Sequence, residues 1–184
     1  MKKSILTAFT ILSLIACDND DERIVINEEI PTDKEETVEY ATFQVNYTFS
    51  ASEDFRHFYH FLIGYVDVEG QQHIDTLKGD EWQYSVAPTP MAEVPEKFLC
   101  VIRAVRKKDI PELTKYAYLL SYEKDVTVTV ANADGSKVRT FDGGPMTSWS
   151  WQASPTSMGE FLVSYSNITL VDFVLEKSAF SSLE

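Results

Sequence analysis

The sequence predicts an all-β protein, an immunoglobulin-like antiparallel β-sandwich of about nine strands with one short helix near the C-terminus. Three observations support this prediction. Short segments from residue 40 onward alternate apolar and polar side chains, turn-forming residues separate them, and one late segment changes to a helical period. Residues 40–184 have the length of an ordinary single domain, and a closed β-barrel is the alternative arrangement.

The first half of this domain contains four expected strands. They cover residues 43–49, 57–68, 73–77 and 81–86. Phe43, Val45 and Tyr47 alternate with polar residues, which is typical of a half-buried strand. Residues 57–68 are apolar on both faces, so this strand is expected in the middle of a sheet, and Pro88 is expected to end the fourth strand.

The second half contains six further segments with strand character. They cover residues 98–107, 115–122, 126–130, 138–141, 147–152 and 168–176. Alternation is strongest in residues 98–107, where Phe98, Cys100 and Ile102 share one face. Asp134 and Gly135 form a dipeptide that is common in hairpin turns, so residues 138–141 should pair back onto the preceding strand.

Residues 155–166 are expected to form the helix. Apolar side chains recur there with the spacing i, i+3, i+4 and i+7, which places them on one helical face. Ser154 is a favourable N-cap residue, and Pro155 suits the first helical position.

The N-terminus has the layout of a secretory signal. Lys2 and Lys3 precede an apolar run that ends at Ala16, and this run is shorter than the roughly 20 residues that span a membrane. Residues 14–17, Leu-Ile-Ala-Cys, resemble the bacterial lipobox. The resemblance implies that residues 1–16 are a signal peptide that is removed and that Cys17 is acylated, which would attach the protein to outer-membrane lipid. Two or three acyl chains would make a stable anchor.

Residues 17–39 are acidic and read as a disordered tether. The acidic residues directly after the cysteine are Asp18, Asp20, Asp21 and Glu22. This run resembles the export signal of Bacteroidota lipoproteins, which implies exposure on the outer face of the outer membrane. A solvated spacer is the alternative interpretation of the run, and it leaves a periplasmic orientation open.

Charge and cysteine content limit the classes of function. The chain has 29 acidic and 16 basic residues, a net charge of −13, which argues against nucleic-acid binding. With Cys17 acylated, Cys100 has no partner for a disulfide within the chain. Its apolar neighbours indicate a small buried residue rather than a reactive thiol.

A second resemblance covers most of residues 40–176. The segments that carry it are residues 47–50, residues 63–70, Trp82, residues 95–98 and residues 116–122. This order of strands and turns resembles small Bacteroidota surface lipoproteins with one immunoglobulin-like domain. That group has no agreed molecular function, so the resemblance implies no catalytic residues.

The sequence contains no pattern typical of an enzyme. There is no nucleophile elbow, no zinc-protease pair on a helix and no phosphate-binding loop. His57 and His60 would point to opposite faces of the expected strand and could not share a metal ion. His73 could face one of them across the hairpin, but solvated or hydrogen-bonded histidines are the favoured interpretation. We therefore expect no catalytic residues, no metal site and no cofactor.

Two weaker candidate sites remain. Trp149 and Trp151 should point to the same side of an extended segment, where they would form either a platform for sugar or aromatic ligands or ordinary core. Asp75-Thr76-Leu77 resembles the O-glycosylation signal of Bacteroidota secreted proteins, which implies a glycan on Thr76.

The expected function is that of a lipid-anchored, non-enzymatic binding or accessory protein of the outer membrane, with an unknown protein or glycan partner. One alternative is a carbohydrate-binding module of a glycan-capture system. A second alternative is a structural subunit of a surface protein assembly.

Overall fold

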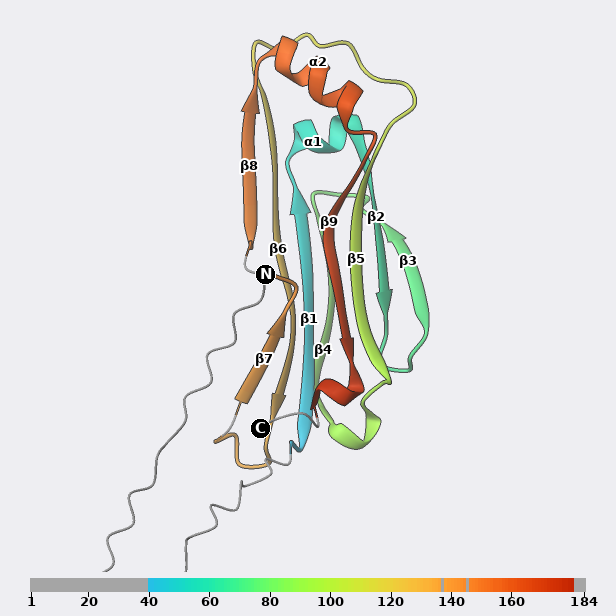
Figure 1. Cartoon of the computed structure of the whole chain (residues 1–184), viewed down its shortest axis with the longest axis vertical. Helices are drawn as coiled ribbons and strands as arrows, with labels where there is room; N and C mark the ends of the chain where they lie inside the picture. The colour runs from blue at the N-terminus through green and yellow to red at the C-terminus, as the bar shows by residue number, and fades with distance from the viewer. Residues whose placement is uncertain (1–39, 137, 145, 181–184) are drawn as a thin grey trace, which may run out of the picture. The chain divides into compact units, whose positions relative to one another are not determined.

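The computed structural model describes residues 40–136, 138–144 and 146–180. In these residues the chain forms two antiparallel sheets that stack as a β-sandwich, with a helix near the C-terminus (Figure 1). The fold class predicted from the sequence is therefore confirmed.

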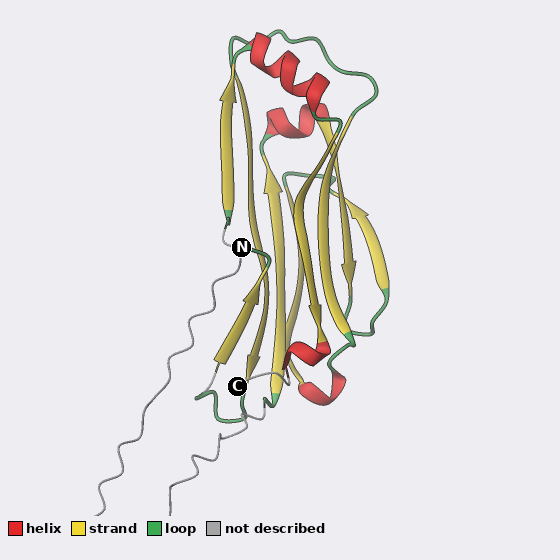
Figure 2. Cartoon of the chain, viewed as in Figure 1, coloured by secondary structure: helices red, strands yellow, loops and turns green. Residues whose placement is uncertain are grey.

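The described residues form nine strands and two α-helices. The strands are β1 (Thr42–Ala51), β2 (Tyr59–Val66), β3 (Gln72–Thr76), β4 (Glu81–Pro90), β5 (Lys97–Arg106), β6 (Tyr118–Ala131), β7 (Val138–Asp142), β8 (Ser148–Ala153) and β9 (Asn167–Glu176). The helices are α1 (Glu53–Phe58) and α2 (Pro155–Ser164), with short 3-10 turns η1 (Met91–Glu93) and η2 (Lys177–Phe180). Figure 2 shows both α-helices at one end of the sandwich and both 3-10 turns at the other.

The first sheet has the order β4-β1-β6-β7, and β8 also pairs with β6. The second sheet has the order β3-β2-β5-β9. Because β1 pairs with β4 while β2 pairs with β5, the chain crosses between the sheets, as the B–E and C–F pairs do in immunoglobulin-like sandwiches. The long strand β6 carries β8 along residues 118–123 and β7 along residues 127–131.

The core lies between the sheets and consists of every second side chain along the strands, the ones that face inward. Val45, Tyr47, Ile63, Cys100 and Val128 are fully buried there. Cys100 is thus a buried residue, as expected, and burial raises the pKa of its thiol to about 12, which keeps it protonated and unreactive.

Helix α1 corrects the prediction of a strand over residues 57–68. Ser52 caps this helix by accepting a hydrogen bond from the Phe55 amide, and Phe55 and Phe58 bury the inner side of the turn. Strand β2 starts only at Tyr59, so His57 and His60 lie on different elements rather than on opposite faces of one strand.

Two strand boundaries also differ from the prediction. Strand β4 continues to Pro90 because it is an edge strand, where a proline removes no ladder hydrogen bond on its open side. The separate strands expected at 115–122 and 126–130 are one strand, β6.

Replacing Ser52 with alanine should lower the free energy of unfolding by about 1–2 kcal/mol. The Ser52 hydroxyl also donates to the Leu119 carbonyl at 2.7 Å and accepts from the Ser121 amide at 3.0 Å, so it ties α1 to β6. The matched control is Ser154→Ala, which removes the exposed cap of α2 and should cost about 0.5–1 kcal/mol. Urea denaturation measures both; equal losses would contradict the tie to β6.

Candidate functional site

A cavity of about 210 Å³ lies at one edge of the sandwich, where α1, α2, β6, β8 and β9 meet. It is lined by Phe55, Tyr122, Trp149, Phe161, Tyr165, Ile168, Thr169 and Leu170. Five of these eight residues are aromatic. Strands β8 and β9 are edge strands of the two different sheets, so the cavity occupies the opening between the sheets on this side.

Strand β8 places the two tryptophans of the expected platform toward this opening. Trp149 and Trp151 are half-buried, whereas Ser148, Ser150 and Gln152 between and beside them are exposed. The Trp149 ring stacks on Tyr122, its cross-strand partner, with ring centroids 6.0 Å apart. The tryptophans therefore share one side, but their rings rest on other rings instead of forming a flat exposed surface.

Helix α2 covers the cavity and is held in place by β2 and β5. The Tyr59 hydroxyl donates to the Tyr165 carbonyl at 2.6 Å, and the Arg106 guanidinium donates to the Leu162 carbonyl at the end of the helix. Phe161 packs against Trp151 with ring centroids 5.1 Å apart. These contacts fix the aromatic side chains of α2 in the wall of the cavity.

The cavity is uncharged. None of the described residues that line it has an ionisable acid or base group other than tyrosine, and burial raises the pKa of Tyr122, which keeps it neutral. The hydroxyls of Tyr122, Tyr165 and Thr169 and the indole N–H of Trp149 are the polar side-chain groups of the lining residues. Since a protein cavity of about 150 Å³ can bind benzene, this one has room for a single uncharged ring or a group of similar size.

The opposite edge of the sandwich is filled by its own side chains. The indole N–H of Trp82 on β4 donates to the Asp75 carboxylate on β3 at 2.9 Å, which joins the edge strands of the two sheets. The Tyr65 ring lies 5.3 Å from Trp82 and 4.7 Å from Tyr84 between ring centroids. The two edges of the sandwich thus differ. At the β3 and β4 edge, packed rings and a hydrogen bond fill the space between the sheets, whereas the cavity lies at the β8 and β9 edge.

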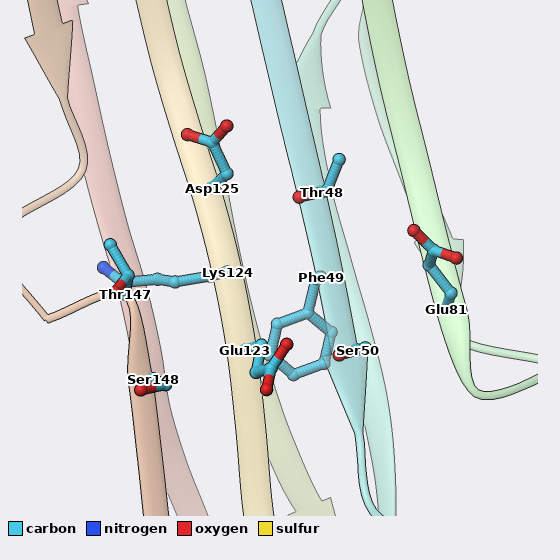
Figure 3. A pocket seen from close by; sticks show the side chains of 9 residues that line it. All are labelled: Thr48, Phe49, Ser50, Glu81, Glu123, Lys124, Asp125, Thr147 and Ser148. Carbon is cyan, nitrogen blue, oxygen red and sulfur yellow. The ribbon is translucent and has the colours of Figure 1, made fainter.

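A larger hollow of about 370 Å³ lies on the outer face of the first sheet. Figure 3 shows Glu81 on β4 separated from Glu123 and Asp125 on β6 by strand β1, so the three carboxylates do not converge. In the same view the Lys124 side chain extends toward Thr147, and its ammonium group donates to the Gly143 carbonyl at 2.6 Å. We therefore assign the candidate site to the aromatic cavity.

The structure places the remaining candidates apart from the cavity. Thr76 is exposed at the end of edge strand β3, and its glycosylation stays a prediction. His73 contacts Asp67 at 2.7 Å between ring nitrogen and carboxylate oxygen. In the described ranges, no three or more histidine, cysteine or acidic side chains lie together as metal ligands would.

The anchor and export residues lie outside the described residues. These are Cys17, Asp18, Asp20, Asp21 and Glu22, together with the signal peptide 1–16 and the tether 17–39. In the part of the chain that is described, no helix is long and apolar enough to cross a membrane.

Sequence reasoning identified Trp149 and missed the other aromatic residues of the cavity wall. Phe55 lies outside the strands expected from the sequence, whereas Tyr122 and Phe161 fall in an expected strand and in the expected helix. The spacing of Phe55, Phe58 and Tyr59 at i, i+3 and i+4 after Ser52 is the signal that could have revealed α1 and its inner face. Comparisons of the chain with protein-family models, with curated protein sequences and with solved structures give no match.

Proposed function

We propose that this chain is a lipid-anchored, non-enzymatic binding protein of the outer membrane whose ligand places one uncharged, ring-sized group in the aromatic cavity. The observation that carries the proposal is the wall of this cavity, which is rich in rings and has no charged side chain. Aromatic side chains bind apolar and ring-shaped groups through burial and ring stacking. A charged ligand would lose its hydration there without gaining an ion pair.

The position of the cavity supports this role for an anchored protein. Strand β1 begins at the end of the sandwich opposite α1 and α2 (Figure 1). The described part of the chain therefore begins at the end of the sandwich away from the helices that cover the cavity.

The expected affinity for a single ring is low. Burying a phenylalanine-sized group yields about 1.5–3 kcal/mol, and a few favourable ring contacts add about 0.5–1.5 kcal/mol each. These values correspond to dissociation constants on the order of millimolar. The natural ligand must therefore make further contacts outside the cavity to bind tightly.

Titration with p-cresol tests the proposal. We would use the complete chain with Cys17→Ser, so that no acyl chain is attached, and follow the indole N–H resonances of Trp82, Trp149 and Trp151 by NMR. The Trp149 resonance should shift with saturation, and Trp149→Ala should weaken binding at least tenfold. The matched control is Trp82→Phe at the sealed edge, which should leave the affinity unchanged.

Two further probes separate the alternatives. Toluene-4-sulfonate has the same ring with a charge and should bind at least tenfold more weakly than p-cresol. Methyl β-glucoside tests the carbohydrate-binding alternative, and a saturable response to it that exceeds the response to p-cresol would replace the proposal. Binding of p-cresol that survives Trp149→Ala would place the ring elsewhere and contradict it.

A further inference from the structure

We infer that the ligand is an extended strand of a partner protein, which adds antiparallel to β9 and inserts one aromatic side chain into the cavity. The inference rests on the proposed function of the same cavity and names the partner that would supply the ring. Such strand addition obtains affinity from main-chain hydrogen bonds and specificity from pockets for alternate side chains.

Within the described residues, strand β9 pairs with no strand on the side away from β5. It is the last strand of its sheet in the described residues and spans Asn167–Glu176. The Lys177 amide donates to the Glu96 carbonyl at 2.9 Å, so Lys177 and Glu96 form a hydrogen-bonded pair at the end of the ladder between β9 and β5. Because such pairs alternate, residues 171, 173 and 175 also bond to β5, whereas the main-chain groups of Asp172, Val174 and Glu176 face the open edge.

The same reasoning applies at the other end of β9. The Arg106 amide donates to the Ser166 carbonyl at 2.9 Å, so Ile168 bonds to β5 and the main-chain groups of Thr169 face outward from the sheet. The outward-facing residues have even numbers from 172 to 176 but an odd number at 169. The register shift between Ile102 and Arg103 of β5 accounts for this change. The open edge therefore continues up to the part of β9 that lines the cavity.

The cavity lies where an added strand would place an inward-facing side chain. Ile168 and Leu170 of β9 line its wall on the inner face of the sheet. A residue paired with Ile168 in an added strand has its side chain on that same face. One ring at this position would enter the space between β9, Trp149 and Tyr122.

The charges beside the open edge favour a basic strand. Asp172 and Glu176 are exposed on the outer face of β9 and flank Val174, which is 51% exposed. Opposite charges in directly paired positions stabilise a sheet, so lysine or arginine fits across from both acidic residues. Residues 40–184 contain 19 acidic and 12 basic residues, so two copies of this domain repel each other. The occupant is therefore a different protein with a basic, aromatic-bearing strand.

A designed peptide provides the probe. Its sequence is KVTVKVTFT, capped by acetyl and amide groups. Its lysines lie opposite Glu176 and Asp172, and its phenylalanine lies opposite Ile168 if the added strand leaves Leu170 unpaired, as β5 does at the register shift. One control peptide has alanine in place of phenylalanine. A second control is N-methylated at the two residues opposite Val174 and Asp172, which removes the main-chain donors that would bond to β9.

Binding is measured by NMR with the complete chain carrying Cys17→Ser. The parent peptide should bind at least tenfold more tightly than p-cresol and displace it, and each control peptide should lose at least tenfold in affinity. Amide exchange at Asp172 and Val174 should slow in the complex. On the protein side, Val174→Pro should abolish peptide binding while leaving p-cresol binding intact, because it blocks the open edge without removing a bond to β5.

The outcomes separate the two proposals. If p-cresol binds through Trp149 but the peptide binds no more tightly than p-cresol, or the N-methylated peptide binds equally well, strand addition is overturned and the cavity function stands. If p-cresol does not bind at all, the cavity function fails first. If the free protein sediments as a dimer with protected amides at Asp172 and Val174, the strand comes from a second copy, and a separate partner is excluded.

Discussion

Replacing Phe55 with alanine is expected to lower the free energy of unfolding by about 3–5 kcal/mol. Phe55 is 1% exposed, and its ring lies 5.2 Å from Tyr59, 5.0 Å from Phe61 and 6.1 Å from Trp149 between centroids. The loss combines the transfer of a buried ring to water with the cost of the space left behind. Urea denaturation at pH 7, analysed with a common slope, measures the change.

The variant Phe161→Ala tests whether the loss of stability comes from the burial of Phe55 or from its place in the cavity wall. Phe161 lines the same cavity from α2 but is only half-buried, so Phe161→Ala should cost about 1–2 kcal/mol. Because Phe55→Ala enlarges the cavity, it should also allow 2-naphthol, a larger ring than p-cresol, to bind and to raise the stability of the variant. A loss below about 1.5 kcal/mol for Phe55→Ala would contradict the buried position of α1.

Elements set by local signals were predictable from the sequence. Helix α2 follows from Ser154, Pro155 and the helical spacing of apolar residues after them, and the structure contains all of these features: Ser154 accepts from the Ser157 amide, and Met158 and Leu162 are buried. Strands β1 and β5 follow from alternation, because one face of each is buried between the sheets. In both cases the information lies within about ten residues.

Helix α1 was missed because long-range contacts stabilise it. It has only six residues, which is too short for a clear period, and its cap residue Ser52 bonds to Leu119 and Ser121 of a distant strand. The continuity of β6 was missed for a similar reason. Lys124 interrupts the apolar alternation, and only the fold reveals that its ammonium group binds the Gly143 carbonyl.

The sequence indicated that the tryptophans share one side but not what surrounds them. Alternation alone places Trp149 and Trp151 together. Whether their rings form a platform, fill the core or line a cavity depends on α2 and β9, which pack over them from later in the chain. Sheet pairing and edge position are properties of the whole topology, so the open edge of β9 could not be read from residues 167–176.

Raising the pH above 10 is expected to destabilise the domain because its buried tyrosines resist ionisation. Tyr47 and Tyr59 are 0% and 1% exposed; burial raises the pKa of Tyr47 far above its ordinary value of 10.0 and that of Tyr59 to about 12. The unfolded chain loses these protons near pH 10 while the folded chain keeps them, so stability is full below pH 10 and falls as the pH rises. At pH 11 each tyrosine should cost about 1.4 kcal/mol.

Replacing each buried tyrosine with phenylalanine shows how much of the alkaline loss of stability comes from that residue. Tyr47→Phe and Tyr59→Phe should each remove about 1.4 kcal/mol of the loss between pH 8 and pH 11, as measured by urea denaturation. Tyr116→Phe is the matched control, because Tyr116 is 100% exposed and has no buried hydroxyl to remove. The two buried variants should differ in stability at pH 7. Tyr59→Phe removes the hydrogen bond to the Tyr165 carbonyl, so its free energy of unfolding should fall by about 1 kcal/mol. The Tyr47 hydroxyl is buried without a partner in the described structure, so the free energy of unfolding of Tyr47→Phe should rise by about 1 kcal/mol.

The pH 7 result for Tyr47→Phe is the sharper of the two tests. The Tyr47 ring packs between Tyr84 and Phe173, so the ring contacts remain in the variant and only the hydroxyl is removed. A loss of stability would mean that this hydroxyl has a hydrogen-bonding partner, such as a buried water molecule between the sheets. An alkaline profile unchanged from the parent would mean that Tyr47 ionises in the folded domain, which the packing of the two sheets around it does not allow.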